Sequence, residues 1–503
     1  MKHFFFLPVL ILMNFVLLCA RAEATAFTVK SGGGGNFTTI SACANAASAG
    51  DTCTVFAGSY GGWTQSASGT AGNPITFQAN PGDSVTITSG ITMSSRSYIT
   101  IHGFIFTSNA HIVGNGSTQH CIIDSNTMAG TQVFQIKDGL GNGGSDNIFS
   151  NNTVNVGSIS SSTPAVYVYG DRNRFENNEI FGGGGDCFDL GGTNVVVRNN
   201  FCHDLDGSAS GEHIDFIQEM GGGTTPPLKF ALVENNVEQK CINDGGNCHF
   251  IIVRTGGAPA ADTLIVRYNF AQNLNGTGAS FGGIGDNVPN ARFYNNTMAT
   301  ERRDPENGAC VSFQNAANGV VLNNICYNTM ANQWSPTVGL SFGNGNIAFT
   351  SGYVGSWNSP YSTEATYNAL RNLNPLFANY PNDASLLPSS PAKAAGVRLT
   401  TVASGDSGTG TSLKVADARF FQPGWAGTQG DWIRVGALST AQIRAIDYST
   451  NMLTLASSIG RSVGDPVYLY KDSSGKVVLT GALPDVGSYT GPLPPVNLEV
   501  NVK

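Results

Sequence analysis

The sequence predicts an all-β solenoid, a parallel β-helix of about ten coils, and two observations lead to that prediction. Short apolar segments end again and again at a corner residue in a similar local context, at separations of 22 to 36 residues. A repeat of this length is the sequence signature of a solenoid. Only 12% of the residues are charged while glycine reaches 63 residues, which describes an extended β architecture with many turns. The corner residues are Gly103, Asn126, Asn152, Asn178, Asn200, Asn236, Asn269, Asn296, Asn324 and Asn346.

The preference for Asn at the corners has a physical reason. Asn tolerates the left-handed backbone that a tight corner needs, and Asn side chains at the same corner of successive coils can hydrogen-bond along the axis as a ladder. Alternating residues such as Val195 and Val197 then fill the interior, and the stack of coils supplies the core. A leucine-rich repeat would need a regular leucine framework, and a β-sandwich would not explain the recurrent corner.

The first 26 residues read as a secretory signal peptide. A basic start precedes an apolar run from Phe4 to Leu18, and small-residue sites end at Ala22 and Ala26. No later apolar stretch is long enough to span a bilayer. We therefore expect a soluble protein that is secreted, extracellular or periplasmic, with no membrane contact.

The segment after Phe27 should form a short amphipathic helix at Ile40–Ala47 and a strand at Thr52–Phe56. This arrangement resembles the start of the pectate-lyase-like superfamily of right-handed parallel β-helix proteins, and the resemblance extends to about Gly396. It implies a right-handed solenoid over residues 27–398, whose open end the helix plugs. The superfamily contains lyases, hydrolases and epimerases of acidic polysaccharides, as well as non-enzymatic members.

The C-terminal part departs from the repeat, which fades near Thr350. Residues 373–396 resemble the closing segment of these proteins, although the usual final phrase, LPDVGSY, comes only at Leu483–Tyr489. Between them, residues 399–474 contain short alternating strands and predict a small all-β insert. Residues 475–503 would then be the closing segment and tail.

Charge and cysteine content restrict the partners and the compartment. The net charge of -8 argues against nucleic acid as a partner, and we expect a monomer. Nine of the ten cysteines follow the signal peptide, and export allows disulfides. Cys43 with Cys53, and Cys241 with Cys248, are near enough in sequence to close small loops, whereas the odd count leaves at least one thiol, expected to be buried and inert.

The candidate chemistry lies between residues 186 and 218. In the strand CFDL, alternation turns Asp189 outward; in HIDF, it leaves His213 and Asp215 outside. Successive coils stand roughly 4.8 Å apart, so outward residues should form one row. That row is Gln135, Lys137, Tyr167, Tyr169, Asp189, His213, Asp215, the segment His249 to Arg254, Ser312 and Gln314. The two longest repeat separations, 36 and 33 residues, flank this patch, and their extra residues would wall a groove.

Two reactions fit such a row. Hydrolysis of a glycosidic bond needs paired carboxyls, for which Asp189 and Asp215 are candidates. Elimination needs a base that removes the proton alpha to a uronate carboxylate, a cation that neutralises this carboxylate, and an acid that protonates the leaving oxygen. His213 or Tyr169 could serve in the proton transfers. The same face argument gives the predicted substrate-binding residues, which are Lys137, Tyr167, Gln218, His249 and Arg254, with Lys137 or Arg254 as the cation.

We therefore expect a carbohydrate-active enzyme that cleaves an extracellular polysaccharide containing uronate, with elimination preferred over hydrolysis. The rival hypothesis is a non-catalytic glycan-binding or adhesion protein, in which the Asn ladders and Gly corners make a stiff rod and the face only binds glycans. Polygalacturonases carry an Asp-Asp pair and a His-Gly, but Asp186 stands alone here and Ile214 follows His213. The Trp-Ile-Asp-His stretch of pectate lyases is absent too. No cofactor is required, although Ca²⁺ could bind Asp186, Asp189 and Asp215.

Overall fold

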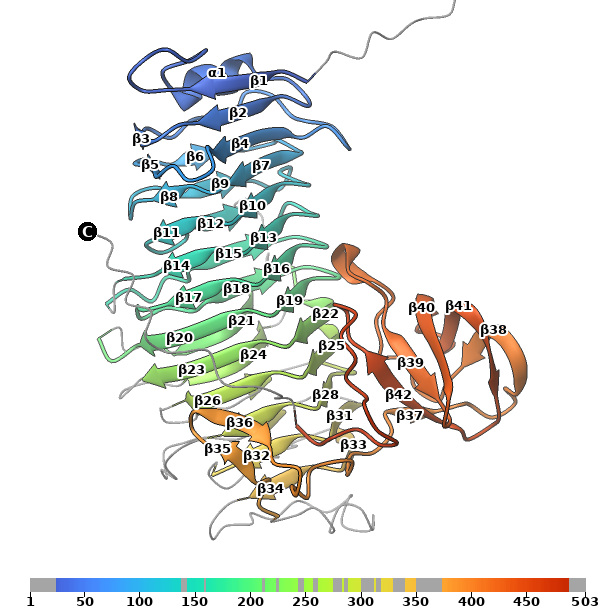
Figure 1. The fold of residues 1–503 in the computed structure, drawn as a ribbon. Coiled ribbons are helices and arrows are strands. Elements are labelled where there is room, and N and C mark those ends of the chain that lie inside the picture. Colours follow the sequence, from blue (N-terminus) through green and yellow to red (C-terminus); the bar gives the residue numbers. More distant parts are fainter. Residues whose placement is uncertain are drawn as a thin grey trace, which may run out of the picture.

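A computed structural model shows a long stack of short strands with a smaller β unit against its side (Figure 1). It describes residues 24–136, 143–157, 160–209, 213–222, 226–242, 248–256, 261–274, 283–284, 288–299, 312–313, 318–328, 340–349 and 373–487. The expected right-handed parallel β-helix is confirmed, with three long parallel sheets that run along the solenoid axis. We call the sheets A, B and C.

Sheet A has 13 strands in parallel register. They are β1 (Ala26–Val29), β2 (Thr52–Val55), β4 (Ile75–Ala79), β7 (Ile99–His102), β10 (Ile122–Asp124), β13 (Ile148–Ser150), β16 (Arg174–Glu176), β19 (Val196–Arg198), β22 (Lys229–Glu234), β25 (Asp262–Arg267), β28 (Arg292–Tyr294), β31 (Gly319–Leu322) and β33 (Leu340–Asn344).

Sheet B has 12 strands, each following a sheet A strand after a corner. They are β3 (Gly58–Tyr60), β5 (Val85–Ile87), β8 (Ile105–Phe106), β11 (Thr127–Ala129), β14 (Thr153–Asn155), β17 (Glu179–Phe181), β20 (Phe201–Asp206), β23 (Val237–Ile242), β26 (Phe270–Leu274), β29 (Thr297–Ala299), β32 (Ile325–Tyr327) and β34 (Ile347–Phe349).

Sheet C has nine strands and carries most of the predicted site residues that the structure describes. They are β6 (Ile91–Thr92), β9 (Ile112–Gly114), β12 (Phe134–Ile136), β15 (Val166–Tyr169), β18 (Phe188–Gly191), β21 (Ile214–Gly222), β24 (Cys248–Gly256), β27 (Gly283–Ile284) and β30 (Ser312–Phe313). Inward side chains from all three sheets form one continuous apolar core, so each coil is stabilised by its neighbours.

The corner between sheets A and B is built from two adjacent residues with separate tasks. The ladder residue is the predicted Asn: its backbone N–H and its amide both donate to the side-chain oxygen of the Asn one coil further on. The amide-to-oxygen distances lie between 2.9 and 3.1 Å from Asn126 through Asn346. The left-handed residue is the one before it, such as Asn177 (φ 57°) or Tyr268 (φ 55°). The prediction that a single Asn does both was therefore wrong, and Gly103 (φ 79°) occupies the left-handed position, not the ladder position.

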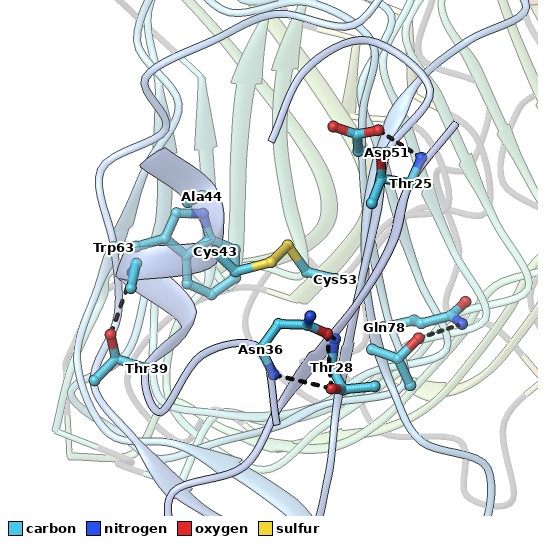
Figure 2. Close-up of a disulfide and its surroundings, with 12 residues drawn as sticks. Thr25, Thr28, Asn36, Thr39, Cys43, Ala44, Asp51, Cys53, Trp63 and Gln78 are labelled. Atoms are coloured by element: carbon cyan, nitrogen blue, oxygen red, sulfur yellow. Dashed lines mark hydrogen bonds between the residues drawn. A yellow bond between two sulfur atoms is a disulfide. The ribbon is translucent and has the colours of Figure 1, made fainter. Parts of the chain in front are cut away.

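The N-terminal end of the solenoid is closed by α1 (Ile40–Ala46), as expected (Figures 1 and 2). Its buried residues Ile40, Cys43 and Ala44 face the core. Thr39 caps the helix by accepting the Ala42 N–H at 3.2 Å. Figure 2 shows the Cys43–Cys53 disulfide, which fastens the helix to β2.

Asp51 holds the first strand from the same end, because its Oδ1 accepts the Thr25 N–H at 2.7 Å. β1 begins at Ala26. Signal cleavage after Ala26 would therefore cut into this strand, whereas cleavage after Ala22 would leave it whole. Residues 1–23 lie outside the described part of the chain.

The C-terminal part contains a short hairpin, β35 (Phe377–Asn379) and β36 (Asp383–Leu386), and then a six-stranded antiparallel sheet, in agreement with the predicted β-rich insert. The strands of that sheet are β37 (Thr400–Thr401), β38 (Gly408–Lys414), β39 (Trp432–Val435), β40 (Ser439–Asp447), β41 (Met452–Arg461) and β42 (Pro466–Lys471), with the 3-10 turn η1 (Trp425–Gly427) between β38 and β39.

This six-stranded unit packs on the outer face of sheet A (Figure 1). The face is apolar there, with Val196, Leu232 and Ile265 buried beneath it. In the same interface, the fully buried Arg267 binds Glu234 through Nε (2.6 Å) and Asp431 through both terminal nitrogens (2.7 Å each). The unit is thus joined to the solenoid by both packing and paired charge.

Three disulfides have both cysteines among the described residues, and they join Cys43 to Cys53, Cys187 to Cys202, and Cys241 to Cys248. Two of these were predicted, and together they indicate an oxidising compartment. Cys121 is a free, buried cysteine, and burial raises its pKa to about 11, as expected for an inert thiol. Within the described residues, no helix has the length and apolar character needed to cross a bilayer.

Candidate active site on the outer face of sheet C

Two columns of polar side chains run across the outer face of sheet C, one coil above the next. The first column consists of Asp186, Asp215 and His249. The Asp215 N–H donates to Asp186 Oδ1 at 2.8 Å, and the β21–β24 register places His249 opposite Asp215. In the second column, Tyr167 pairs with Asp189, and Asp189 pairs with Gln218. The site therefore spans four consecutive strands.

The predicted row was wrong on one point, because Asp189 is opposite Gln218 and not opposite Asp215. Between the two columns, each strand places two successive residues in the core: Cys187 and Phe188 on one coil, Phe216 and Ile217 on the next. Simple alternation misses this doubling. The stretches DCFD, DFIQ and HFII share a polar-apolar-apolar pattern, and aligning them would have placed Asp186 next to Asp215.

Asp215 holds two imidazoles. Its Oδ2 lies 2.8 Å from His213 Nδ1, and its Oδ1 lies 2.7 Å from His249 Nδ1. The carboxylate is completely buried, although alternation predicted it to be exposed, because these rings and neighbouring side chains cover it; the His213 side chain is 19% exposed. Burial alone would raise the pKa of Asp215, but the two imidazoles hold it below its usual range. Asp215 is therefore an ionised group that fixes the orientation of both rings.

Asp186 and Gln218 support this carboxylate from the side. With its amide oriented toward the two acids, Gln218 donates to Asp215 Oδ2 at 3.1 Å and to Asp186 Oδ2 at 2.7 Å. The pKa of Asp186 is raised well above its usual range, first by burial and then by the charge of Asp215. The pKa values of the two neighbouring acids are thus shifted in opposite directions, that of Asp215 downward and that of Asp186 upward.

A tyrosine pair stands one coil away in the second column. The Tyr169 hydroxyl lies 3.0 Å from the Tyr167 hydroxyl and 3.3 Å from Asp189 Oδ1. Burial, and secondarily the charge of Asp189, raises the pKa of Tyr167. The Tyr167 hydroxyl therefore keeps its proton at neutral pH.

Two further carboxyls lie behind the face, inside the solenoid, and were not predicted. Glu219 and Glu238 are fully buried, and their carboxyl oxygens have no hydrogen-bond partner. Burial and the charge of Asp189 raise the pKa of Glu219 to about 8; burial and the charge of Asp215 raise that of Glu238 well above its usual range. The strand register explains why Glu238 faces the core, since it pairs with Cys202 on one side and Ala271 on the other, and both of these residues are in the core.

Some predicted site residues lie outside what the structure describes. These are Lys137, Gln314 and the side chain of Arg254, together with parts of the two loops expected to wall a groove. The backbone of Arg254 belongs to β24, where it pairs with Met220, five residues further along the strand than His249. Ser312 begins β30 and pairs with Gly283.

The side chains of His213, Asp215 and His249 also have the composition of a metal-binding set, with ligand atoms within 4.8 Å of one another. Two imidazole nitrogens and a carboxylate suit Zn²⁺ or a similar transition ion, whereas Ca²⁺ prefers oxygen ligands. The predicted calcium set fits less well, because Asp189 belongs to the other column and both Asp215 oxygens contact imidazoles.

Comparisons with known proteins give likenesses among solved structures, whereas no protein-family model and no curated protein matches the sequence. The PL6 family alginate lyase AlyGC matches at 14% identity and a TM-score of 0.40, over 70% of this chain and 54% of its own, so the chain spans about half of that protein. An alginate lyase from Paenibacillus sp. str. FPU-7 matches at 18% identity and a TM-score of 0.35, over 61% of this chain and 95% of its own. PfbA, a surface adhesin of Streptococcus pneumoniae, matches at 10% identity and a TM-score of 0.38, over 62% and 85%.

Proposed function

We propose that the protein is a polysaccharide lyase that cleaves a uronate-containing glycan by β-elimination on the outer face of sheet C. The observation that carries the proposal is the buried, ionised Asp215, which holds the imidazoles of His213 and His249 by their Nδ1 atoms. A carboxylate at Nδ1 fixes the tautomer and leaves Nε2 as the proton-accepting atom.

In the proposed reaction, His213 is the base because its side chain is more exposed than that of His249, 19% against 6%. Its Nε2 removes the proton alpha to the uronate carboxylate. The electron pair forms a double bond as the bond to the glycosidic oxygen breaks, and the tyrosine pair, with Tyr169 hydrogen-bonded to Tyr167, returns a proton to that oxygen. The charge that develops on the uronate carboxylate would be neutralised by the predicted cation, Lys137 or Arg254.

Hydrolysis by Asp189 and Asp215 has less support. A glycosidase needs one carboxyl to protonate the leaving oxygen and a second to attack or to activate water. Asp215 is fully buried with an imidazole on each oxygen, and Asp189 lies within hydrogen-bonding distance of Tyr169. Neither carboxyl is therefore placed to meet a sugar directly.

The test is incubation of the secreted protein with a panel of uronate polymers while the absorbance of unsaturated chain ends is recorded. We expect new reducing ends and that absorbance to rise together. New reducing ends without the absorbance would indicate hydrolysis instead. Because no step involves a metal ion, dialysis against a chelator should leave turnover unchanged.

The second candidate function is a non-catalytic glycan-binding or adhesion protein, and the unbroken Asn ladder favours it, since it makes the solenoid a stiff rod. Binding of a uronate polymer that is never cleaved, by wild type and by Asp215→Asn alike, would support this candidate against the lyase.

A further inference from the structure

A polar pocket lies away from sheet C, where the six-stranded unit meets the outer face of sheet A. Its volume is about 460 Å³, which is in the range of small-molecule sites. Three arginines line it, Arg292 from β28 with Arg398 and Arg419 from the six-stranded unit and its connection, against the single acid Asp417.

The one acid is already committed to one arginine. Arg292 is buried and binds Asp417 Oδ2 through Nε (3.0 Å) and Nη2 (2.6 Å), while its Nη1 donates to the Asn318 carbonyl oxygen at 2.7 Å. The other Asp417 oxygen accepts the backbone N–H of Arg419 at 2.9 Å. Asp417 therefore leaves the charges of the other two guanidinium groups unbalanced.

Arg419 shows this imbalance most clearly. Its Nε is buried with no hydrogen-bond partner, and no ion pair is found for Arg419 or Arg398 among the described residues. The pKa of Arg292 is lowered, first by burial and also by the positive charge of Arg419, although Asp417 acts in the other direction. Three guanidinium groups that share a pocket with a single acid, which is already paired with Arg292, favour the binding of an anion beside the other two.

The remaining walls indicate which kind of anion fits. Val320, Leu399 and Phe420 supply apolar surface, and Asn290 and Asn451 supply amides. A surface that combines apolar side chains with a few polar groups suits a sugar ring that carries hydroxyls, and a guanidinium fork binds a carboxylate through two parallel hydrogen bonds. We propose that this pocket is a binding site for an acidic sugar unit, with its carboxylate held by Arg419 and Arg398.

The proposal does not depend on the lyase reaction, because the pocket shares no residue with the site on sheet C. It would give the chain a second contact with an acidic glycan, at the junction between the solenoid and the six-stranded unit. Loss of one site should leave the other intact, so the two proposals can fail separately.

The experiment is calorimetric titration of the full chain at fixed low ionic strength with a uronic-acid disaccharide, the matching neutral disaccharide and inorganic sulfate. Arg419→Gln and Arg398→Gln are compared with Arg444→Gln, which removes an exposed arginine from β40 of the same unit. Arg398 is exposed, so its variant tests the charge without risk to the fold.

We expect one acidic-sugar binding event to weaken at least tenfold in Arg419→Gln and Arg398→Gln, the effect of losing a hydrogen bond to a charged group. Arg444→Gln should bind like the wild type, and turnover at the sheet C site should be unchanged in all three. Equal binding by all variants, or equal binding of the neutral disaccharide, would overturn the proposal. Sulfate that binds as tightly as the acidic sugar would show a simple anion site and overturn it as well.

Discussion

Asp215 is the residue on which the candidate site depends. A buried carboxylate is costly unless it is paired, and here two imidazoles pair with it, one from its own strand and one from the next coil. The two rings therefore belong to one unit, whose geometry is set by a carboxylate that is fully buried.

Replacing His213 by Ala should lower kcat by about 10²-fold or more, the usual contribution of a general base. His249 and Gln218 still contact Asp215 in this variant, and the position of His213 is partly exposed, so the protein should stay folded with only a modestly lower melting temperature. The measurement is the initial rate of unsaturated-end formation together with thermal unfolding.

The matched control is His102→Ala. His102 also contacts an acid through Nδ1, Asp124 at 2.9 Å, but it lies on sheet A. This control should keep full activity. If His213→Ala keeps full activity too, or unfolds readily, then His213 is structural and the base must be sought elsewhere.

Glu219 predicts a loss of stability with rising pH. Its pKa is raised in the folded state from 4.5 to about 8, so between these values the folded protein keeps a proton that the unfolded chain releases. The contribution of protonated Glu219 to the free energy of unfolding is thus fully present below about pH 4.5, and it is lost as the pH rises toward 8. Glu219→Gln should remove this slope and raise stability at pH 8 by a few kcal/mol, at about 1.4 kcal/mol per pKa unit.

Denaturant unfolding at several pH values measures this effect. Glu179→Gln on sheet B, a partly exposed carboxyl, is the control and should leave the slope as in the wild type. A Glu219→Gln variant with the wild-type pH dependence would show that the buried carboxyl is not neutral in the folded protein.

At the scale of single elements, the Asn corners link sequence to fold most directly. Their spacing predicted the solenoid, because a ladder requires the same residue at the same place in every coil. Which residue of the Asn-Asn pair takes the left-handed backbone was not predictable, since Asn suits both positions. The structure assigns the left-handed backbone to the first residue of each pair, and in two coils that residue is Ser125 or Tyr268 instead of Asn.

Asn178→Ala should destabilise the protein by about 2–4 kcal/mol, because it leaves several buried groups without partners, at about 1–3 kcal/mol for each. The groups are the backbone and side-chain N–H of Asn152 and the carbonyl oxygen of Phe149. Asn177→Gly, which removes an exposed amide and keeps the left-handed corner, should cost about 1 kcal/mol or less. Equal losses for the two variants, measured by denaturant unfolding, would argue against the ladder as a stabilising element.

The candidate site was predictable in part at this same scale. Alternation identified His213, Asp215 and Asp189 as outward residues, but the relation between strands depends on register, which a single strand does not reveal. The doubled core residues between the columns shift that register, so Asp186 takes the place assigned to Asp189. Glu219 and Glu238 could not be found, because pattern reasoning does not place acids in a core.

For the whole molecule, the docking of the six-stranded unit is the feature that sequence reasoning left open. Its strands were predicted, but not its position. The three successive valines Val195, Val196 and Val197 contained the signal: two fill the core, and Val196 faces outward under the unit. An outward apolar residue on consecutive sheet A strands indicates a covered face.

Arg267→Met tests how firmly the unit is attached. It leaves Glu234 and Asp431 buried without their partner, so we expect a loss of about 3–5 kcal/mol and earlier protease cleavage of the connections around the unit. Arg444→Met, at an exposed position, should have no measurable effect. Unchanged protease resistance in Arg267→Met would show that apolar packing and the other contacts, such as Arg292 with Asp417, hold the unit in place without Arg267.

The closed N-terminal end has a consequence for self-association. An uncovered end of a solenoid would present strand edges and apolar core to a second molecule, which could continue the stack as a fibre. Here residues 30–37 bond to the edge of β1, with the Phe37 N–H donating to the Thr28 carbonyl oxygen, and α1 covers the core. A Cys43→Ala/Cys53→Ala variant, whose lid is no longer fastened, should therefore form rods that lengthen with protein concentration in light scattering and electron microscopy, while the wild type stays dispersed. On this view the disulfide at one end of the molecule protects its solubility as a whole.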